Sequence, residues 1–595
     1  MEARMNTTKL EQNVSSAALE NIQKWLDEPK YADYRDELVT MIEGERWKEL
    51  EDAFFKVIEF GTAGIRGATG IGSNRINLVT IGSATQALCQ YLADYNGESK
   101  QKGIVIAYDT RLTSVEFSRY AASVAAANGF KTYIFTTYRS TPELSFAVRH
   151  LGCAGGIVLT ASHNPPSDNG FKAYWNDGCQ LVAPHDHGVV VASQGITEIH
   201  TANYDEAVDA RDIIEIGKEI DDVYIQTVAS TSVSDARDIA IAYSPLHGAG
   251  QTNTIPVLRA AGFGRVFPVE AQLVPDGNFP TIPSGKPNPQ DPPANDMAVA
   301  LMHEKHADIA ITNDPDADRF GAMIRQGDET IYLSGNQAAV LATDYVLGEM
   351  QRRGELTPNH YVVKTIVTTD LISALADRYG VECVDNLLVG FKYVGETIRK
   401  REATDKEFVI GAEESFGFIK GDYARDKDGA SGALMIAEAA AQLKLQGKTL
   451  FDRLLELYRE YGYYQESLID IFYPGADGFQ RMSAIMAQLR EQPPAEIGEH
   501  KVTAVLDYKT LEKTNVATGD TSAIDCIAGN VVVLELDGDS RRRLTVRPSG
   551  TEPKLKVYCA WYEPYREGED TKQRYDQLSH ELEALGKELE TILLQ

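Results

Sequence analysis

A pattern of strand, helix, glycine and strand occurs three times in this chain and limits what it can fold into. The first copy spans residues 103–135, the second 238–267 and the third 361–384. In each copy a short β-rich apolar run leads into a helix, and a glycine precedes a second apolar run, as in a βαβ unit. The copies recur about 120–135 residues apart, too far for a short-period solenoid. The chain is therefore predicted to form three related α/β domains.

Both ends of the chain depart from this repeat. Over the first 60 residues, apolar side chains recur at helical spacing among charged ones, which predicts an N-terminal helical extension packed on the first domain. Apolar runs at 531–536 and 543–546 flank a turn at 537–539 and predict an antiparallel hairpin. An amphipathic helix is expected over 571–594, so the last domain is expected to be α+β. We expect domains at 1–205, 206–328, 329–464 and 465–595.

The composition is that of an acidic globular chain. Its net charge of -29, from 87 acidic against 58 basic residues, argues against nucleic acid or anionic membranes as general partners. No apolar run reaches about 18 residues, and the N-terminus lacks the apolar core of a secretory signal, so neither a transmembrane helix nor export is predicted. Six scattered cysteines without C-x-x-C spacing argue against a disulfide framework or a zinc site. They are typical of a reducing cytosol, and we expect a cytoplasmic protein.

A serine follows directly after an apolar run in the first repeat. The segment 160–166 reads T-A-S-H-N-P-P and comes after the run 156–159, so Ser162 stands just past the expected end of a strand. Loops at the carboxyl ends of strands are where α/β proteins bind ligands, and the prolines prevent the strand from continuing. This context indicates an exposed, rigidly placed hydroxyl, although an ordinary turn has the same composition.

Three aspartates lie between two apolar runs in the second repeat. On an extended segment, Asp314, Asp316 and Asp318 fall on one side, where their like charges repel unless a cation lies between them. Carboxylate oxygens are hard ligands that suit Mg²⁺. An EF-hand is excluded, because Arg319 replaces the glycine of its sixth loop position and Arg325 the glutamate of its twelfth. A polar surface turn is the alternative.

Two more polar loops follow. Glu413, Glu414 and Ser415 come after an apolar run, and paired carboxylates beside a hydroxyl suit hydrogen bonding to neighbouring hydroxyls of a sugar. Near the C-terminus, the loop 547–553 reads R-P-S-G-T-E-P and forms a local positive site in an acidic chain. Its candidate anion-binding residues are Arg547, Ser549, Gly550 and Thr551. For both loops the alternative is a solvated turn without a ligand.

These four segments, in this order, resemble the α-D-phosphohexomutase family, which includes phosphoglucomutases and phosphomannomutases. The family's T-A-S-H-N-P, D-x-D-x-D-R, G-E-E-S-F-G and R-P-S-G-T-E-P loops are similar to residues 160–165, 314–319, 412–417 and 547–553, with Ala412 in place of the usual glycine. Further similar segments are 60–67, 170–172, 390–392 and 425–429. The resemblance covers about residues 60–560 and implies three similar α/β domains plus a smaller fourth around a central cleft.

The resemblance also implies a phosphoryl-transfer site. Ser162 is expected to carry the phosphoryl group, and Mg²⁺ is expected to bind it together with Asp314, Asp316 and Asp318. Charge on the phosphoryl group would be neutralised by Arg66, Arg319 and Lys172. Four residues remain open as the acid or base that moves the proton: Lys172, Lys392, His163 and Arg66.

A small sugar phosphate is the implied partner. Glu413 and Ser415 are expected to bind its ring hydroxyls, and the loop with Arg547, Ser549, Gly550 and Thr551 to hold the phosphate that is not reacting. The expected reaction interconverts glucose 1-phosphate and glucose 6-phosphate through glucose 1,6-bisphosphate. Mannose or pentose phosphates are alternative substrates, because glucose and mannose differ only at C2 and the Glu413 loop would contact the 3- and 4-hydroxyls. Monomer and small homo-oligomer both remain open.

Two other classes of protein compete with this interpretation. In a haloacid-dehalogenase-like phosphatase Asp314 would be the nucleophile, but Asp318 stands where that family prefers a hydroxyl, and the Ser162 and Arg547 loops stay unexplained. A catalytically silent sugar-phosphate sensor would be expected to lack the nucleophile or a metal ligand, and here all four are present.

Overall fold

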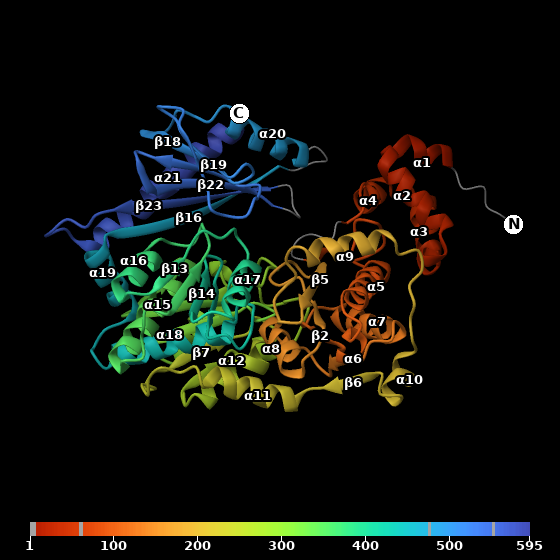
Figure 1. Ribbon diagram of the computed structural model, residues 1–595, viewed down its shortest axis with the longest axis horizontal. Helices are drawn as coiled ribbons and strands as arrows, with labels where there is room; N and C mark the ends of the chain where they lie inside the picture. Colours follow the sequence, from red (N-terminus) through yellow and green to blue (C-terminus); the bar gives the residue numbers. More distant parts are fainter. Residues whose placement is uncertain (1–6, 59–63, 474–477, 550–553, 595) are drawn as a thin grey trace.

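Four β-sheets, one in each of four consecutive regions of the chain, organise the protein (Figure 1). The computed structural model describes residues 7–58, 64–473, 478–549 and 554–594. Within these ranges, no helix combines the length and the apolar character needed to cross a membrane.

The first three sheets share a four-strand centre. Two parallel strands joined by a helix are followed by a third parallel strand, and a fourth strand pairs antiparallel with the third. In chain order these strands are β2 (Ile104–Tyr108), β3 (Thr132–Phe135), β4 (Gly155–Leu159) and β5 (Asp168–Trp175); β7 (Ile241–Ser244), β8 (Val266–Pro268), β9 (Ile309–Asn313) and β10 (Phe320–Gln326); and β12 (His360–Lys364), β13 (Glu382–Val384), β14 (Glu407–Glu413) and β15 (Gly417–Lys420). The joining helices are α7 (Ser114–Ala127), α12 (Gly250–Ala260) and α16 (Leu371–Tyr379). The prediction of three related α/β domains is confirmed.

Edge strands extend two of these sheets. In the first, β1 (Ile65–Ala68) pairs with β5, and β6 (Ile213–Ile216) pairs with β3. In the second, β11 (Glu329–Tyr332) pairs with β10. The first sheet therefore reaches residue 216 and the second residue 332, whereas the sequence placed domain ends at 205 and 328.

The fourth sheet is antiparallel and forms the α+β domain that the sequence predicts. Its strands lie in the order β16 (Tyr463–Phe472), β23 (Lys554–Glu563), β22 (Asp539–Pro548), β21 (Val532–Leu536), β18 (His500–Asp507), β19 (Glu512–Asn515) and β20 (Thr521–Ala523), and β17 (Glu496–Ile497) pairs with β18. Helices α20 (Gly478–Glu491) and α21 (Thr571–Leu594) share its apolar core. The expected hairpin is β21–β22, and its turn has φ values of 53° at Asp537 and 76° at Gly538, as a tight hairpin requires.

The N-terminal extension is helical, as predicted. Its described helices are α1 (Thr7–Asn13), α2 (Ser16–Asp27), the 3-10 helix η1 (Pro29–Tyr34), α3 (Arg35–Glu43) and α4 (Trp47–Phe54). Trp25 meets the ring of Phe54 edge to face at 5.4 Å, and Ile71 of the first domain joins the same buried cluster. The Leu78 amide at the start of α5 (Leu78–Tyr95) donates a hydrogen bond to the Tyr34 hydroxyl at 3.1 Å. The extension is thus docked on the first domain.

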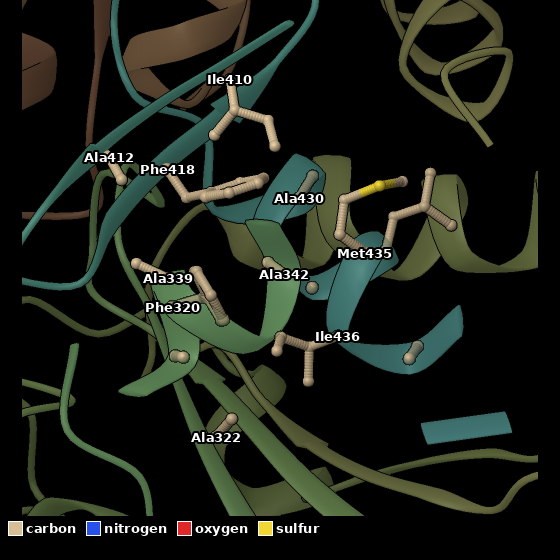
Figure 2. Packing of buried hydrophobic residues seen from close by; sticks show 14 of the residues in the cluster. Phe320, Ala322, Ala339, Ala342, Ile410, Ala412, Phe418, Ala430, Met435 and Ile436 are labelled. Carbon is tan, nitrogen blue, oxygen red and sulfur yellow. The ribbon is translucent and has the colours of Figure 1, made fainter. Parts of the chain in front are cut away.

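Helix α18 (Gly429–Lys444) joins the second and third domains. It packs against Phe320 of β10 and Phe418 of β15, and α15 (Gly335–Arg353) lies beside it (Figure 2). The rings of Phe320 and Phe418 meet edge to face, with centroids 6.5 Å apart. A Cβ on Gly432 would come within 2.2 Å of the Phe320 ring, so only glycine permits this approach. A close-packed interior deforms little. We therefore expect this packing to fix the loops that follow β9 and β14 relative to each other.

Candidate active site

Three chemically different loops occupy equivalent places in the three related sheets. Ser162 lies between β4 and β5, the aspartates lie between β9 and β10, and Ser415 lies between β14 and β15, so each loop connects the third strand to the fourth. The fourth domain contributes Arg547 from β22. A cleft of about 1010 Å³ is lined by residues of all four domains, among them Ser162, Arg319, Glu413 and Arg547.

Ser162 lies at the floor of this cleft with only 2% of its surface exposed. Its Oγ donates a hydrogen bond to Oδ2 of Asp314 at 2.7 Å and is 3.1 Å from Nδ1 of His163. Its φ of 52° is in the left-handed region that serine seldom adopts. The expectation of an exposed serine is wrong, because the aspartate loop of the second domain lies against the hydroxyl.

The aspartate segment is a turn and not the extended segment that the sequence suggested. The Ala317 amide donates to the Asp314 carbonyl at 2.9 Å, and Ala317 has a φ of 50°. Three backbone hydrogen bonds hold this turn from three domains. They run from Thr141 to the Asp316 carbonyl (2.9 Å), from Ala249 to the Pro315 carbonyl (2.8 Å) and from Gly429 to the Ala317 carbonyl (3.1 Å). The carboxylates converge because the chain curls, not because they alternate along a strand.

The three carboxylates can hold a metal ion. They are buried, and one oxygen from each lies within 4.8 Å of the others. In the described ranges, Oδ1 of Asp316 and Oδ1 of Asp318 have no hydrogen-bond partner, which leaves two charged acceptors free for a cation. Burial, together with the charges of Asp316 and Asp318, raises the pKa of Asp314 well above its ordinary value. A hard divalent cation matches this all-oxygen donor set.

Four cationic side chains surround the aspartates. Lys172 Nζ lies 2.8 Å from Oδ2 of Asp316 and 3.3 Å from Oδ2 of Asp318. Although burial alone would lower the pKa of Lys172, the two carboxylates raise it, so the amine stays protonated. Lys427 Nζ lies 3.0 Å from Oδ2 of Asp318, and Arg319 Nε lies 3.9 Å from the same carboxylate. Arg66 completes the group from β1.

The four acid–base candidates differ in charge and place. Burial, with the nearby Arg319 and Arg66, lowers the pKa of His163 well below its ordinary value, so the imidazole is neutral at pH 7. Arg66 donates to Oδ1 of Asn164 at 3.4 Å, in the same loop as Ser162. Lys392, at the start of α17 (Phe391–Arg401), lies 3.7 Å from Asp186, and burial lowers its pKa. The structure therefore brings His163, Arg66 and Lys172 to the serine and the aspartates, and Lys392 to the cleft wall of the third domain.

The third and fourth domains contribute the remaining candidates. Ser415 Oγ donates to Oε1 of Glu413 at 3.0 Å, and Lys427 lies 3.8 Å from the same oxygen. Arg547 pairs in register with Lys556 of β23, so two cationic residues occur side by side on the cleft wall. Ser549 also lines the cleft. The predicted residues Gly550 and Thr551 lie outside the described ranges.

Several cleft residues were not singled out by the sequence. Lys427 lies in a segment that is similar to the family, but its sequence context assigns it no role; Lys556, Lys286 and Tyr393 lie outside the motifs that indicate the site. Lys556 could have been found by extending the Arg547 hairpin through its register. Lys286 enters the cleft on a loop of the second domain with no regular pattern, so no sequence signal marks it.

Comparison with known proteins agrees with this architecture. Models of the phosphoglucomutase/phosphomannomutase alpha/beta/alpha domains I, II and III match residues 57–199, 222–327 and 334–461, and the C-terminal domain model matches 498–578. A phosphoglucomutase of Staphylococcus aureus (strain bovine RF122 / ET3-1) is 36% identical over 518 residues, which covers 86% of this chain and 91% of that protein.

Two solved structures share the fold. The open form of the exocytosis-sensitive phosphoprotein pp63/parafusin, a phosphoglucomutase from Paramecium, aligns with a TM-score of 0.62 at 18% identity and covers 89% of this chain and 95% of that one. A phosphoglucomutase/phosphomannomutase family protein from Burkholderia thailandensis aligns with a TM-score of 0.59 at 18% identity, covering 89% and 98%. At these identities they show the fold alone.

Four domains of these types around one cleft define an enzyme of the phosphohexomutase class, a group of isomerases. The chain belongs to the phosphoglucomutase/phosphomannomutase family.

Proposed function

We propose that this protein is a phosphoglucomutase that interconverts glucose 1-phosphate and glucose 6-phosphate through a phosphoserine at Ser162. The observation that carries the proposal is the 2.7 Å hydrogen bond from Ser162 Oγ to Asp314 of a three-carboxylate turn, at the floor of a cleft lined by four domains. The 36% identity to a protein named phosphoglucomutase supports glucose as the sugar.

Asp314, Asp316, Asp318 and the phosphorylated Ser162 would hold a Mg²⁺ ion. When bound, the ion supplies charge neutralisation for the transferring phosphoryl group. The oxygens of Asp316 and Asp318 that accept no hydrogen bond within the described residues support this assignment. Lys172, which is held as a cation beside both, would add to the positive field from the protein side.

The proposed reaction is a phosphoryl transfer in each direction. A hydroxyl oxygen of the sugar phosphate bonds to phosphorus, the bond from phosphorus to Ser162 Oγ breaks, and the hydroxyl proton ends on Ser162. The product is glucose 1,6-bisphosphate. It reverses its orientation in the cleft and returns its other phosphoryl group to Ser162. His163 is suited to exchange a proton with Ser162, because the imidazole is neutral and its Nδ1 lies 3.1 Å from Oγ.

Binding both orientations of the intermediate requires two kinds of contact. Glu413 and Ser415 would bind ring hydroxyls, and Arg547 with Lys556 would hold the phosphate that is not reacting. Movement of the fourth domain toward the others would exclude water, which otherwise competes as acceptor. Contacts to the 3- and 4-hydroxyls discriminate little at C2, so mannose 1-phosphate is the second candidate substrate and a pentose phosphate the third.

The test is a comparison of kcat/KM for glucose 1-phosphate, mannose 1-phosphate and ribose 1-phosphate, with Mg²⁺ and a trace of glucose 1,6-bisphosphate. Ser162→Ala is expected to lose activity by several orders of magnitude, about 10⁴-fold or more. Ser167→Ala is the matched control, because Ser167 lies in the same loop with its side chain exposed to solvent. Full activity of Ser162→Ala would rule out the phosphoserine, and a leading rate with another sugar would correct only the substrate.

A further inference from the structure

A buried ion pair lies beneath the loop of residues 160–168, which we call the Ser162 loop. Asp109 and Arg111 follow β2, and both are buried, with Arg111 Nε 3.2 Å from Oδ2 of Asp109. The cleft does not reach either residue. Neither has been given a role in the chemistry above, yet a buried guanidinium in a domain core needs a physical reason.

The guanidinium of Arg111 donates hydrogen bonds to backbone carbonyls of the Ser162 loop. Its two terminal nitrogens donate four hydrogen bonds, to the carbonyls of Ser162 (2.6 Å), Asn164 (2.6 Å), Pro165 (2.6 Å) and Asp168 (2.8 Å). Four acceptors from a single loop converge on one side chain. Because the guanidinium donors have a fixed geometry, these hydrogen bonds determine the backbone path of the Ser162 loop as well as its distance from the sheet.

Asp109 reaches the other side of the same serine. Its Oδ2 accepts a hydrogen bond from Thr160 Oγ1 at 2.7 Å, and Thr160 Oγ1 in turn accepts one from the Ser162 amide at 2.7 Å. Its Oδ1 accepts from the Ser114 hydroxyl at 2.7 Å. Both backbone polar groups of Ser162 are thus connected to the Asp109–Arg111 pair by hydrogen bonds. The carbonyl is bonded directly to Arg111, and the amide is linked to Asp109 through the Thr160 hydroxyl.

This double attachment coincides with an unfavourable backbone conformation. Ser162 has a φ of 52°, which a residue other than glycine keeps only when its surroundings enforce it. In that conformation its Oγ faces Asp314 at 2.7 Å. A relaxed Ser162 loop would turn the hydroxyl away from the aspartates.

A loop of the second domain seals the pair from water. The ring of Phe279 lies over the guanidinium, 5.3 Å from Arg111 Cζ. Gly277 packs so closely that a Cβ there would be 2.5 Å from the Leu112 amide and 2.8 Å from Arg111 Cα. Hydrogen bonds in such a dry site are stronger than at the surface.

We propose that Asp109 and Arg111 are positioning residues for the nucleophile: they hold the backbone of Ser162 in its strained conformation, so that Oγ faces the metal site and the transferring phosphoryl group. This inference rests on the proposed function of Ser162. It assigns the pair an effect on the rate of phosphoryl transfer, with no contact to the sugar.

The test compares Arg111→Lys and Arg111→Gln with Arg237→Lys and Arg237→Gln. Arg237 is a matched control, because it donates to the carbonyls of Ala261 and Ala236, pairs with Glu438 at 3.0 Å and lies away from the cleft. Four quantities are measured: kcat, KM, the thermal midpoint, and the rate at which glucose 1,6-bisphosphate phosphorylates Ser162, followed by intact mass.

Arg111→Gln is expected to lower kcat and the phosphorylation rate about 100-fold, while KM changes by less than about threefold, because only the reacting atom is misplaced. Arg111→Lys keeps the positive charge but loses the paired donors of the guanidinium. Its kcat and phosphorylation rate are expected to lie between those of Arg111→Gln and those of the wild type. The Arg237 variants are expected to lower the thermal midpoint without changing kcat. Asp109→Asn gives a second route if Arg111→Gln does not fold.

The proposal is overturned if Arg111→Lys and Asp109→Asn phosphorylate Ser162 at the wild-type rate, or if the Arg237 variants lose as much kcat as the Arg111 variants for the same fall in thermal midpoint. Failure of the proposed function looks different, because the wild-type protein itself would then take no phosphoryl group on Ser162.

Discussion

Replacing Thr141 by valine would test how the first domain supports the candidate metal site of the second. Thr141 begins α8 (Thr141–Leu151), is fully buried, and its Oγ1 donates to Oδ2 of Asp316 at 2.8 Å. Valine keeps the shape and removes only this hydrogen bond, which to a charged acceptor contributes about 1.5–3 kcal/mol. Lys172 Nζ still donates a hydrogen bond to the same oxygen at 2.8 Å, so the Asp316 carboxylate is held less firmly but keeps one partner.

Loss of an outer partner of a metal ligand weakens metal affinity about 10–100-fold, and the remaining lysine places the expected effect of Thr141→Val near tenfold. The assay is the Mg²⁺ concentration for half-maximal activity, supported by calorimetric Mg²⁺ binding. Thr343→Val is the control, because Thr343 is equally buried on α15 and its hydroxyl has no hydrogen-bond partner in the described part of the chain. An unchanged Mg²⁺ requirement in Thr141→Val, or an equal change in Thr343→Val, would refute the reasoning.

Two further predictions concern stability. Burial raises the pKa of Glu466 to about 7, with the nearby Asp370 adding to the effect, so the native state holds a proton that the unfolded state releases near pH 4.3. The free energy of unfolding therefore falls as pH rises from about 4 to 7. Glu466→Gln is expected to gain about 3–4 kcal/mol over wild type at pH 8 but little at pH 4, measured by urea unfolding. Gly432→Ala would drive a methyl group into the Phe320 ring and is expected to cost about 1–3 kcal/mol. Gly97→Ala, where nothing lies within 4 Å, should change stability by less than about 0.5 kcal/mol, and equal thermal midpoints for the two variants would contradict the packing argument.

The fold was readable because its signals are local. Each βαβ copy carries its strand, helix and glycine within about 35 residues, and connections of this kind are right-handed and pair parallel. The hairpin at Asp537 and Gly538 was found for the same reason, since its turn residues are adjacent. The loops of the candidate site were found because unusual residue types follow directly on apolar strands.

The features that could not be predicted from the sequence depend on contacts between segments that are far apart in the chain. The exposure of Ser162 was predicted wrongly because the residue that buries it, Asp314, is 152 positions away. The turn at the aspartates was missed because its shape depends on hydrogen bonds from Thr141, Ala249 and Gly429, one from each of three domains. Nothing in the residues next to Arg111 along the chain predicts that its side chain donates to four backbone carbonyls.

The repeated topology explains how one cleft acquires such different chemistry. In each related sheet the loop from the third to the fourth strand leaves a parallel strand at its carboxyl end and returns antiparallel, so its tip stands at the sheet edge where ligands bind. Placing Ser162, Asp316 and Ser415 on three such tips lets each be changed without disturbing a shared core. The charges follow the same division, because Lys172 of the first domain and Lys427 of the third both reach across to the aspartates of the second. Lys172, Lys427, Arg319 and Arg66 together with a divalent ion would carry more positive charge than the three carboxylates offset. This excess is the electrostatic reason to expect the ion and a negatively charged phosphoryl group to bind together.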